Sequence, residues 1–185
     1  MPGRNAISDR DPVRRDADAG IYALVLYLPR ARGVGAGRLG RRRLAAGWYV
    51  YVGSAKRNLV ARLARHLRRA KGPHWHIDHL RALAGVKEIW IWPWTHGGEC
   101  RTNDRIQECS GASVPWTGFG SSDCRCASHL TRFVQKPAAC FGDAPTPLVV
   151  NPGRLRLPRA RGLTLDVKGR ILYRARQSGA AKEPP

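Results

Sequence analysis

Two tyrosines and three other polar residues stand out because their side chains suit phosphate chemistry. Tyr22 ends the tripeptide Gly-Ile-Tyr, and Tyr51 begins the tripeptide Tyr-Val-Gly. Arg62, His66 and Glu99 follow them in that order. Hydrolysis of a phosphodiester needs an activated water, positive charge beside the phosphate oxygens and a group that stabilises the leaving oxygen. A base, an arginine and a metal ion held by a carboxylate meet these three needs.

The chemistry limits which residue can fill each role. Arginine keeps its charge, and its fork matches phosphate oxygens in a way that lysine does not. Tyrosine, with a reference pKa of ~10, is an awkward base unless nearby cations depress its pKa. Glu99 is the single carboxylate in this set of residues. We therefore expect one Mg²⁺ or Mn²⁺ ion at Glu99 rather than a two-metal clamp.

The charge of the chain favours a polyanionic partner. Its 185 residues carry a formal net charge of +20, from 33 Lys and Arg against 13 Asp and Glu. The excess gathers around the motifs, because Asp78 is the single acidic residue between positions 20 and 80. Such density of positive charge is typical of proteins that bind nucleic acid. We expect DNA as the partner, with RNA as the alternative.

Hydropathy indicates a cytoplasmic protein. No apolar run approaches the ~18–20 residues that span a bilayer, so we expect no membrane partner. Residues 1–19 are polar, include four aspartates and lack the apolar stretch of a secretory signal. We interpret them as a flexible leader.

Periodicity predicts the elements that must position these residues. Short apolar runs predict strands at 21–28, 47–52 and 86–92, with a Gly/Arg-rich loop at 30–46 between the first two. Leucines four residues apart predict a helix over 58–70, with Arg62 and His66 on a different face. This pattern predicts an α/β chain of the α+β type, with a three-stranded antiparallel sheet flanked by helices.

Three segments divide the chain. The leader over 1–19 precedes a domain over 20–140, which also holds predicted helices at 73–83 and 99–109 and a loop at 111–126. A Pro/Arg-rich basic extension covers 141–185. Its prolines at 145, 147, 152 and 158 are expected to prevent regular structure for some distance. The apolar runs within 163–173 then predict a small C-terminal hairpin.

The order of these motifs resembles that of the GIY-YIG nuclease superfamily, whose fold is the predicted one. The resemblance implies that Tyr22 activates or positions the water and that Tyr51 shares this work. It implies that Arg62 stabilises the phosphate and that Glu99 binds the single divalent metal. His66 occupies a position where relatives carry Tyr or His.

A closer resemblance covers residues 20 to about 134. His-Trp-His-Ile-Asp at 74–78, the segment 118–126 and Ser-His-Leu at 128–130 are similar to the signatures of a subfamily known as domain of unknown function 123. Some of its members are fused to an endonuclease-III-type DNA glycosylase, which implies a link with DNA repair. Ser54 stands where excision-repair nucleases of the superfamily have a lysine. Candidates for the Asn that many relatives place after the glutamate are Asn103, Ser122 and Asp123.

The cysteines and histidines offer a second kind of metal site. Five cysteines in a reducing compartment argue against a disulfide framework and leave free thiols or metal ligands: Cys100, Cys109, Cys124, Cys126 and Cys140. Cys124, Cys126 and His129 can bind zinc if Cys100 or Cys109 joins them, although their spacing is not a common zinc-ribbon pattern. His74, His76 and His79 can chelate zinc or decorate a helix. We favour the helix.

The sequence therefore supports three hypotheses. The first is a divalent-metal-dependent DNA endonuclease, with Tyr22, Tyr51, Arg62, His66 and Glu99 as the catalytic set. The second is a nucleic-acid-binding module on the same fold without cleavage, and the third is a zinc-stabilised scaffold. The residues predicted to hold the nucleic acid are Ser54, Lys56, Arg57, Arg65 and Arg69.

Overall fold

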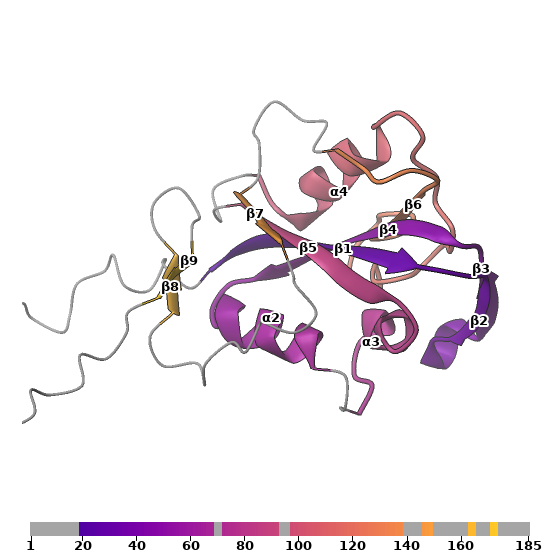
Figure 1. Ribbon diagram of the computed structural model, residues 1–185, viewed down its shortest axis with the longest axis horizontal. Helices are drawn as coiled ribbons and strands as arrows, with labels where there is room; N and C mark the ends of the chain where they lie inside the picture. The colour runs from indigo at the N-terminus through magenta and orange to yellow at the C-terminus, as the bar shows by residue number, and fades with distance from the viewer. Residues whose placement is uncertain are drawn as a thin grey trace, which may run out of the picture.

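The computed structural model describes residues 19–68, 72–92 and 97–138, together with three short strands at 146–149, 163–165 and 171–173. These parts form an α+β arrangement with three α-helices and a mostly antiparallel sheet (Figure 1). In chain order the elements are β1 (Gly20–Leu28), β2 (Arg32–Gly35), η1 (Gly37–Leu39), β3 (Arg41–Leu44), β4 (Gly47–Ala55), α2 (Leu59–Leu67), α3 (His76–Arg81), β5 (Gly85–Trp92), α4 (Glu99–Gln107), β6 (Leu130–Phe133), β7 (Thr146–Val149), β8 (Leu163–Leu165) and β9 (Ile171–Tyr173).

The main sheet has five strands in the order β6-β4-β1-β5-β7, and each neighbouring pair is antiparallel. The three predicted strands form its centre, as β4-β1-β5. The expected three-stranded sheet was incomplete, because the sequence signal of the two edge strands is weak. β6 has four residues, and β7 contains Pro147, which a sheet tolerates at an edge. β7 also lies beyond position 140, where we had expected the domain to end and the prolines to prevent regular structure.

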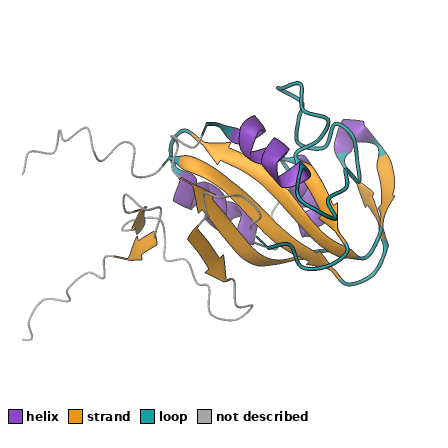
Figure 2. Ribbon diagram, turned by 90° about the horizontal axis from the view of Figure 1, so that it is seen from above, coloured by secondary structure: helices purple, strands orange, loops and turns teal. Residues whose placement is uncertain are grey.

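Helices cover both faces of the sheet, with α2 and α3 on one side and α4 on the other (Figures 1 and 2). β1 supplies apolar side chains to both sides because alternate residues of a strand point in opposite directions. Tyr22 and Leu24 pack with Leu63 of α2 in one core cluster, whereas Ile21 packs with Ile106 of α4 in the other. The central strand is therefore fixed from two sides.

The segment predicted as a loop at 30–46 contains regular structure. β2 and β3 pair as a second, two-stranded sheet, with Arg32 opposite Leu44 and Gly35 opposite Arg41. The sequence pattern does not indicate this pair of strands, because the exposed positions of β3 are arginines rather than β-branched residues. Val34 and Leu44 are its buried anchors.

The predicted helices form, with shorter bounds. α2 begins after Asn58, which adopts a left-handed conformation with φ of 56°. α4 begins at Glu99 and ends two residues before the predicted limit of 109. β8 and β9 pair as antiparallel strands, as the predicted C-terminal hairpin requires. The leader over 1–18 and most of 141–185 lie outside the described residues.

Within the described ranges, no helix has the length and apolar character that crossing a bilayer requires.

Candidate active site and metal-ligand cluster

The two tyrosine motifs meet in the sheet through a tyrosine and a glycine. Tyr22 of β1 lies opposite Gly53 of β4, and its ring crosses that glycine. A Cβ atom at Gly53 would lie 2.5 Å from the phenolic oxygen of Tyr22. Any larger residue at position 53 would therefore clash with Tyr22. The tyrosine of Gly-Ile-Tyr thus explains why Tyr-Val-Gly has a glycine. The strand predicted over 47–52 nevertheless continues past Gly53 to Ala55.

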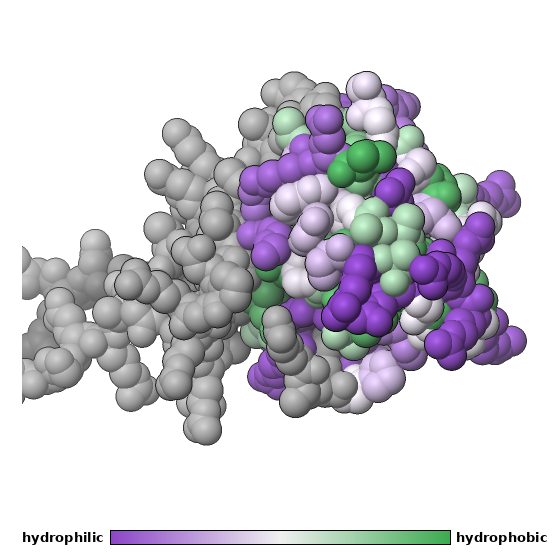
Figure 3. Space-filling view, turned by 45° about the vertical axis from the view of Figure 1, so that its right-hand side comes forward, coloured by the Kyte–Doolittle hydropathy of each residue, from purple (hydrophilic) through white to green (hydrophobic). Residues whose placement is uncertain are grey.

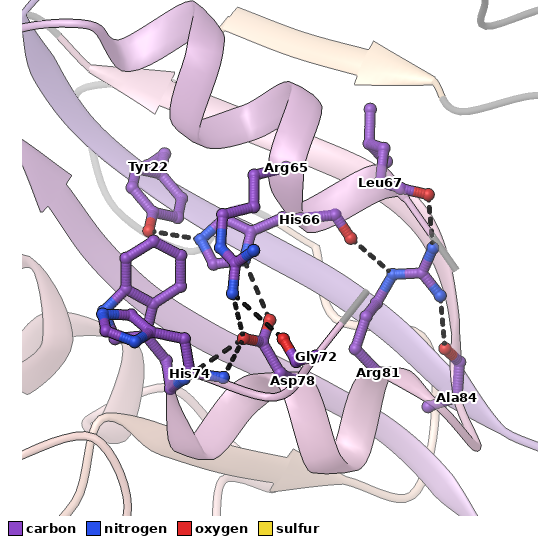
Figure 4. A network of polar contacts seen from close by, with 10 residues as sticks. Tyr22, Arg65, His66, Leu67, Gly72, His74, Asp78, Arg81 and Ala84 are labelled. Atoms are coloured by element: carbon purple, nitrogen blue, oxygen red, sulfur yellow. Dashed lines mark hydrogen bonds and ion pairs between the residues drawn. The ribbon is translucent and has the colours of Figure 1, made fainter. Parts of the chain in front are cut away.

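Tyr22 and His66 form a buried pair between β1 and α2. The phenolic oxygen of Tyr22 lies 2.7 Å from Nε2 of His66, and each residue is 1% exposed (Figure 4). On the other side of the imidazole, Nδ1 faces Oδ1 of Asp78 at 4.0 Å. Oδ2 of Asp78 accepts hydrogen bonds from the backbone N–H groups of His74 and Trp75. The three side chains Tyr22, His66 and Asp78 thus lie in a row, fixed at one end by the start of α3.

Burial keeps both tyrosines protonated. It raises the pKa of Tyr22 above the usual value, although the neighbouring Arg62 guanidinium opposes the shift. Burial also raises the pKa of Tyr51, with Tyr22 and Glu99 adding to the effect. The lowering effect of Arg62 on the two pKa values is therefore smaller than the raising effect of burial, so neither tyrosine is a standing phenolate base at neutral pH.

Arg62 and Arg65 both contact the aromatic side chain of Trp75. The guanidinium carbon of each lies 4.9 Å from the centroid of a Trp75 ring, a separation typical of cation–π contacts. Nη1 of Arg62 donates to the backbone carbonyl of Ser54 at 2.7 Å. Nη2 of Arg65 forms an ion pair with Asp78 at 3.1 Å. Trp75 was not predicted as part of the site, since only tertiary packing brings it under the arginines.

Glu99, the first residue of α4, presents an ionised carboxylate. Its Oε2 accepts a hydrogen bond from the Ser54 hydroxyl, and its Oε1 lies 2.7 Å from Nδ1 of His129. Burial alone would raise the pKa of Glu99, but the hydrogen bonds from His129 and Ser54 outweigh it, with help from the charges of His129 and Arg62. The pKa is therefore lowered. The side chain keeps 27% of its surface exposed.

These residues surround a cleft of about 870 Å³. Tyr51, Arg62 and Glu99 of the predicted catalytic set line it, whereas Tyr22 and His66 lie behind its wall. Of the predicted nucleic-acid-binding residues, four line the cleft and Arg69 falls outside the described residues: Ser54, Lys56, Arg57 and Arg65. Sequence reasoning missed the wall formed by His74, Trp75, His76 and Gly120.

Part of the cleft wall comes from the loop after α4. Ser122 and Asp123 line it, whereas Asn103 is fully buried in α4 and does not. Among the three candidates for the missing Asn, Ser122 and Asp123 are therefore the ones at the cleft. The backbone N–H of Gly120 donates to Nδ1 of His76 at 3.0 Å, which joins the loop to α3. His76 thus contributes a contact between α3 and this loop.

A cluster of possible metal ligands lies on the other side of Glu99. The ligand atoms of Cys100, Cys124, Cys126 and His129 all lie within 4.8 Å of one another, and among the described residues they form the only such group of three or more. We call these four residues the cysteine–histidine cluster. Cys100, Cys124 and Cys126 are free thiols. Cys109 is disulfide-bonded, so the expectation of free thiols or metal ligands is wrong for that residue.

The fold and the two adjoining sites define an α+β domain with a basic cleft and a possible metal-binding cluster beside it. The chain belongs to the family described as domain of unknown function DUF123, whose model matches residues 21–146. This match extends past position 140 and reaches the start of β7. No curated protein and no solved structure matches the chain.

Proposed function

We propose that this chain is a divalent-metal-dependent endonuclease of the GIY-YIG superfamily that hydrolyses phosphodiester bonds in DNA. The observation that carries the proposal is the convergence of five residues on one cleft and its wall. Tyr22, Tyr51, Arg62, His66 and Glu99 come from β1, β4, α2 and α4. They supply a hydrogen-bonded proton path, a phosphate-binding cation and an ionised carboxylate.

The carboxylate fits a Mg²⁺ or Mn²⁺ ion. Glu99 is ionised, half-buried and lines the cleft, and Asp123 is a second carboxylate that lines the same cleft. Mg²⁺ commonly binds through one or two carboxylates and keeps several of its waters. When bound, the ion would stabilise negative charge on the leaving oxygen.

Arg62 is the phosphate-binding residue in this proposal. Its guanidinium carries five N–H donors, so the bond to the Ser54 carbonyl leaves others for phosphate oxygens. The Trp75 ring restricts its motion, which lowers the entropy lost on binding. Lys56, Arg57 and Arg65 line the same cleft. In this proposal they would contact the neighbouring backbone phosphates.

The Tyr22–His66 hydrogen bond is the path for the proton. Once the cleft wall moves so that water reaches Tyr22, the attacking water gives a proton to the Tyr22 oxygen as the phenolic proton passes to Nε2 of His66. The phenol stays neutral, and the positive charge arises on an imidazole that faces the Asp78 carboxylate at 4.0 Å. This route is compatible with the raised pKa of Tyr22, because no phenolate accumulates.

The basic surface extends well beyond the cleft. The residues described from 19 to 68 include no Asp or Glu. Five exposed arginines lie at the β2–β3 end of the molecule: Arg32, Arg38, Arg41, Arg42 and Arg43. Hydrophilic side chains gather on this side of the space-filling view (Figure 3). A duplex that enters the cleft can therefore make further phosphate contacts at this end.

A nicking assay tests the proposal. Purified protein should relax supercoiled plasmid in Mg²⁺ and lose this activity in a chelator. Glu99→Gln should lose it too, while Glu108→Gln, the same change at the exposed far end of α4, should not. If wild-type protein, Glu99→Gln and Glu108→Gln all give the same product, the assignment of Glu99 is wrong.

One observation favours a second function, that of a nucleic-acid-binding module without cleavage. Tyr22 and His66 are each 1% exposed and lie behind the cleft wall, so water reaches them only if the wall moves. This alternative predicts DNA or RNA binding that weakens steeply with salt, with no product in Mg²⁺ or Mn²⁺. The nicking assay separates the two functions.

A further inference from the structure

We propose that the cysteine–histidine cluster binds one zinc ion and that this ion fastens the loop over 118–129 to the first turn of α4. The four ligand atoms lie within 4.8 Å of one another. A tetrahedral zinc site with bonds of about 2.0–2.3 Å places its ligand atoms about 3.5–3.8 Å apart. Small side-chain rotations therefore suffice to close the cluster around an ion.

The donor set selects the metal. Three thiolates and one imidazole are soft or borderline ligands, which suit Zn²⁺ and disfavour Mg²⁺ and Mn²⁺. Iron–sulfur clusters are held in most cases by four cysteines. Four protein ligands also complete a tetrahedron, which is typical of structural rather than catalytic zinc. This site is thus distinct from the one proposed at Glu99, whose ligands are oxygens.

The orientation of His129 is independent support. Its Nδ1 lies 2.7 Å from Oε1 of Glu99, and its Nε2 lies 3.3 Å from Sγ of Cys124. Histidines that bind metals commonly donate one ring N–H to a carboxylate, which leaves the lone pair of the other nitrogen for the metal. The imidazole is 2% exposed, and its backbone is held by Phe119 and Val52. His129 therefore points a fixed nitrogen at the three thiols.

The loop that the zinc ion would hold lacks regular structure. Residues 108–129 form no helix and no named strand between α4 and β6. Gly118 and Gly120 adopt φ values of +82° and +80°. The same loop supplies Ser122 and Asp123 to the cleft. A zinc ion bound by Cys100 and by the loop cysteines would hold this wall against α4, next to Glu99.

Metal analysis of the full chain is the direct test. Protein purified without chelator should contain about one zinc per chain, and Cys100→Ser and Cys126→Ser should each lose most of it. His79→Asn, a histidine change on α3, should retain it. Less than about a tenth of an equivalent of zinc in the wild type, after zinc is supplied during expression, would overturn the proposal.

Two further measurements use wild-type protein, so they test the zinc site even if the cysteine variants fail to fold. After chelation, wild-type protein titrated with Co²⁺ should give the visible absorption of a tetrahedral cobalt–thiolate site. Zinc should also protect Cys100, Cys124 and Cys126 from alkylation, as mapped by mass spectrometry. An octahedral cobalt spectrum, unprotected thiols or a disulfide among the three cysteines in the native protein would contradict the site.

Variants of Glu99, measured for both zinc binding and nicking, test the zinc site and the proposed function separately. Loss of an outer carboxylate lowers metal affinity about 10- to 100-fold, so Glu99→Ala should weaken zinc binding by that factor in a chelator competition. Glu99→Gln keeps an oxygen that accepts from Nδ1 of His129 and should weaken zinc binding less. Zinc at one equivalent with no nicking would refute the nuclease alone, whereas nicking without zinc would refute the zinc site alone.

Discussion

The cleft and the cysteine–histidine cluster meet at Glu99, yet they are assembled by different means. The cleft residues Tyr51 and Arg62 lie on β4 and α2, which the larger of the two core clusters holds in place. Three of the four cluster residues lie in the irregular segment between α4 and β6. Regular elements therefore position the cleft, whereas an irregular loop carries most of the cluster. Damage to one site should spare much of the other.

The largest expected effect is a loss of DNA cleavage that leaves zinc binding intact. Arg62→Ala should lower the rate of DNA cleavage about 10²- to 10³-fold, because a preorganised donor to the transition-state charge is lost. The zinc content should stay at the wild-type level, since Arg62 does not belong to the cluster. Initial rates of plasmid nicking and elemental analysis of the same preparation measure both. Arg62→Lys should recover part of the rate, because it restores the charge but not the fork.

Gly120 lies where the two sites touch, so its substitution should damage both. A Cβ at this position would lie 2.7 Å from the Tyr51 ring and 3.2 Å from Cβ of His129, on a backbone with φ of +80°. Gly120→Ala combines backbone strain with this steric overlap. Its free energy of unfolding should fall by about 1–3 kcal/mol more than that of a variant with the backbone strain alone. Gly111→Ala is the matched control, because Gly111 has φ of +79° and nothing within 4 Å. Denaturant unfolding of both variants gives the difference, and equal losses would refute the contact.

Gly53 tests the cleft side alone. Gly53→Ala should lower the free energy of unfolding by about 1–3 kcal/mol, because the new methyl group would overlap the Tyr22 ring. Gly35→Ala, in another strand and with nothing within 4 Å, should change it little. Zinc content should be normal in both variants. A Gly53→Ala protein as stable as the Gly35→Ala protein would show that the tyrosine does not cross this glycine.

The tyrosines predict a pH effect on stability. Burial raises the pKa of Tyr22 and Tyr51 in the folded state above their unfolded value of ~10. Their contribution is therefore fully present below pH ~10 and is lost as the pH rises toward the folded values, by up to about 1.4 kcal/mol per pH unit for each tyrosine. The free energy of unfolding of wild type and Tyr22→Phe between neutral and alkaline pH measures this slope. Tyr22→Phe should show the shallower decline, and parallel curves would contradict a buried phenol at Tyr22.

The smallest effect concerns the arginines of the β2–β3 end, far in sequence from the cluster. Replacing Arg42 by Gln should weaken DNA binding modestly and reduce the salt slope of the affinity by about 1 if that side chain contacts one phosphate. Cleavage at saturating DNA and zinc content should not change. Equilibrium binding at several salt concentrations measures the slope. An unchanged slope would remove this end of the molecule from the binding surface.

Much of the cleft could be predicted because its residues lie on elements with strong local patterns. The apolar run at 21–28 and the leucines of α2 define a strand and a helix by their periodicity. The strand positions Tyr22, and the helix positions Arg62 and His66. The pairing of Tyr22 with Gly53 could not be read in the same way, since register depends on long-range contacts between strands. Trp75 and Gly120 were missed for the same reason.

The sequence by itself determined the charge, the central strands, the helices and the identity of the chemically capable residues, because these depend on composition and on neighbours a few positions apart. Only the tertiary structure decided that Cys100 rather than Cys109 joins Cys124, Cys126 and His129. It also decided that Glu99 contacts both sites. Spacing along an irregular loop does not define distance in space, because such a loop has no repeating geometry. The loop's course depends instead on long-range contacts, such as the packing of Trp116 and Phe119 in the larger core cluster.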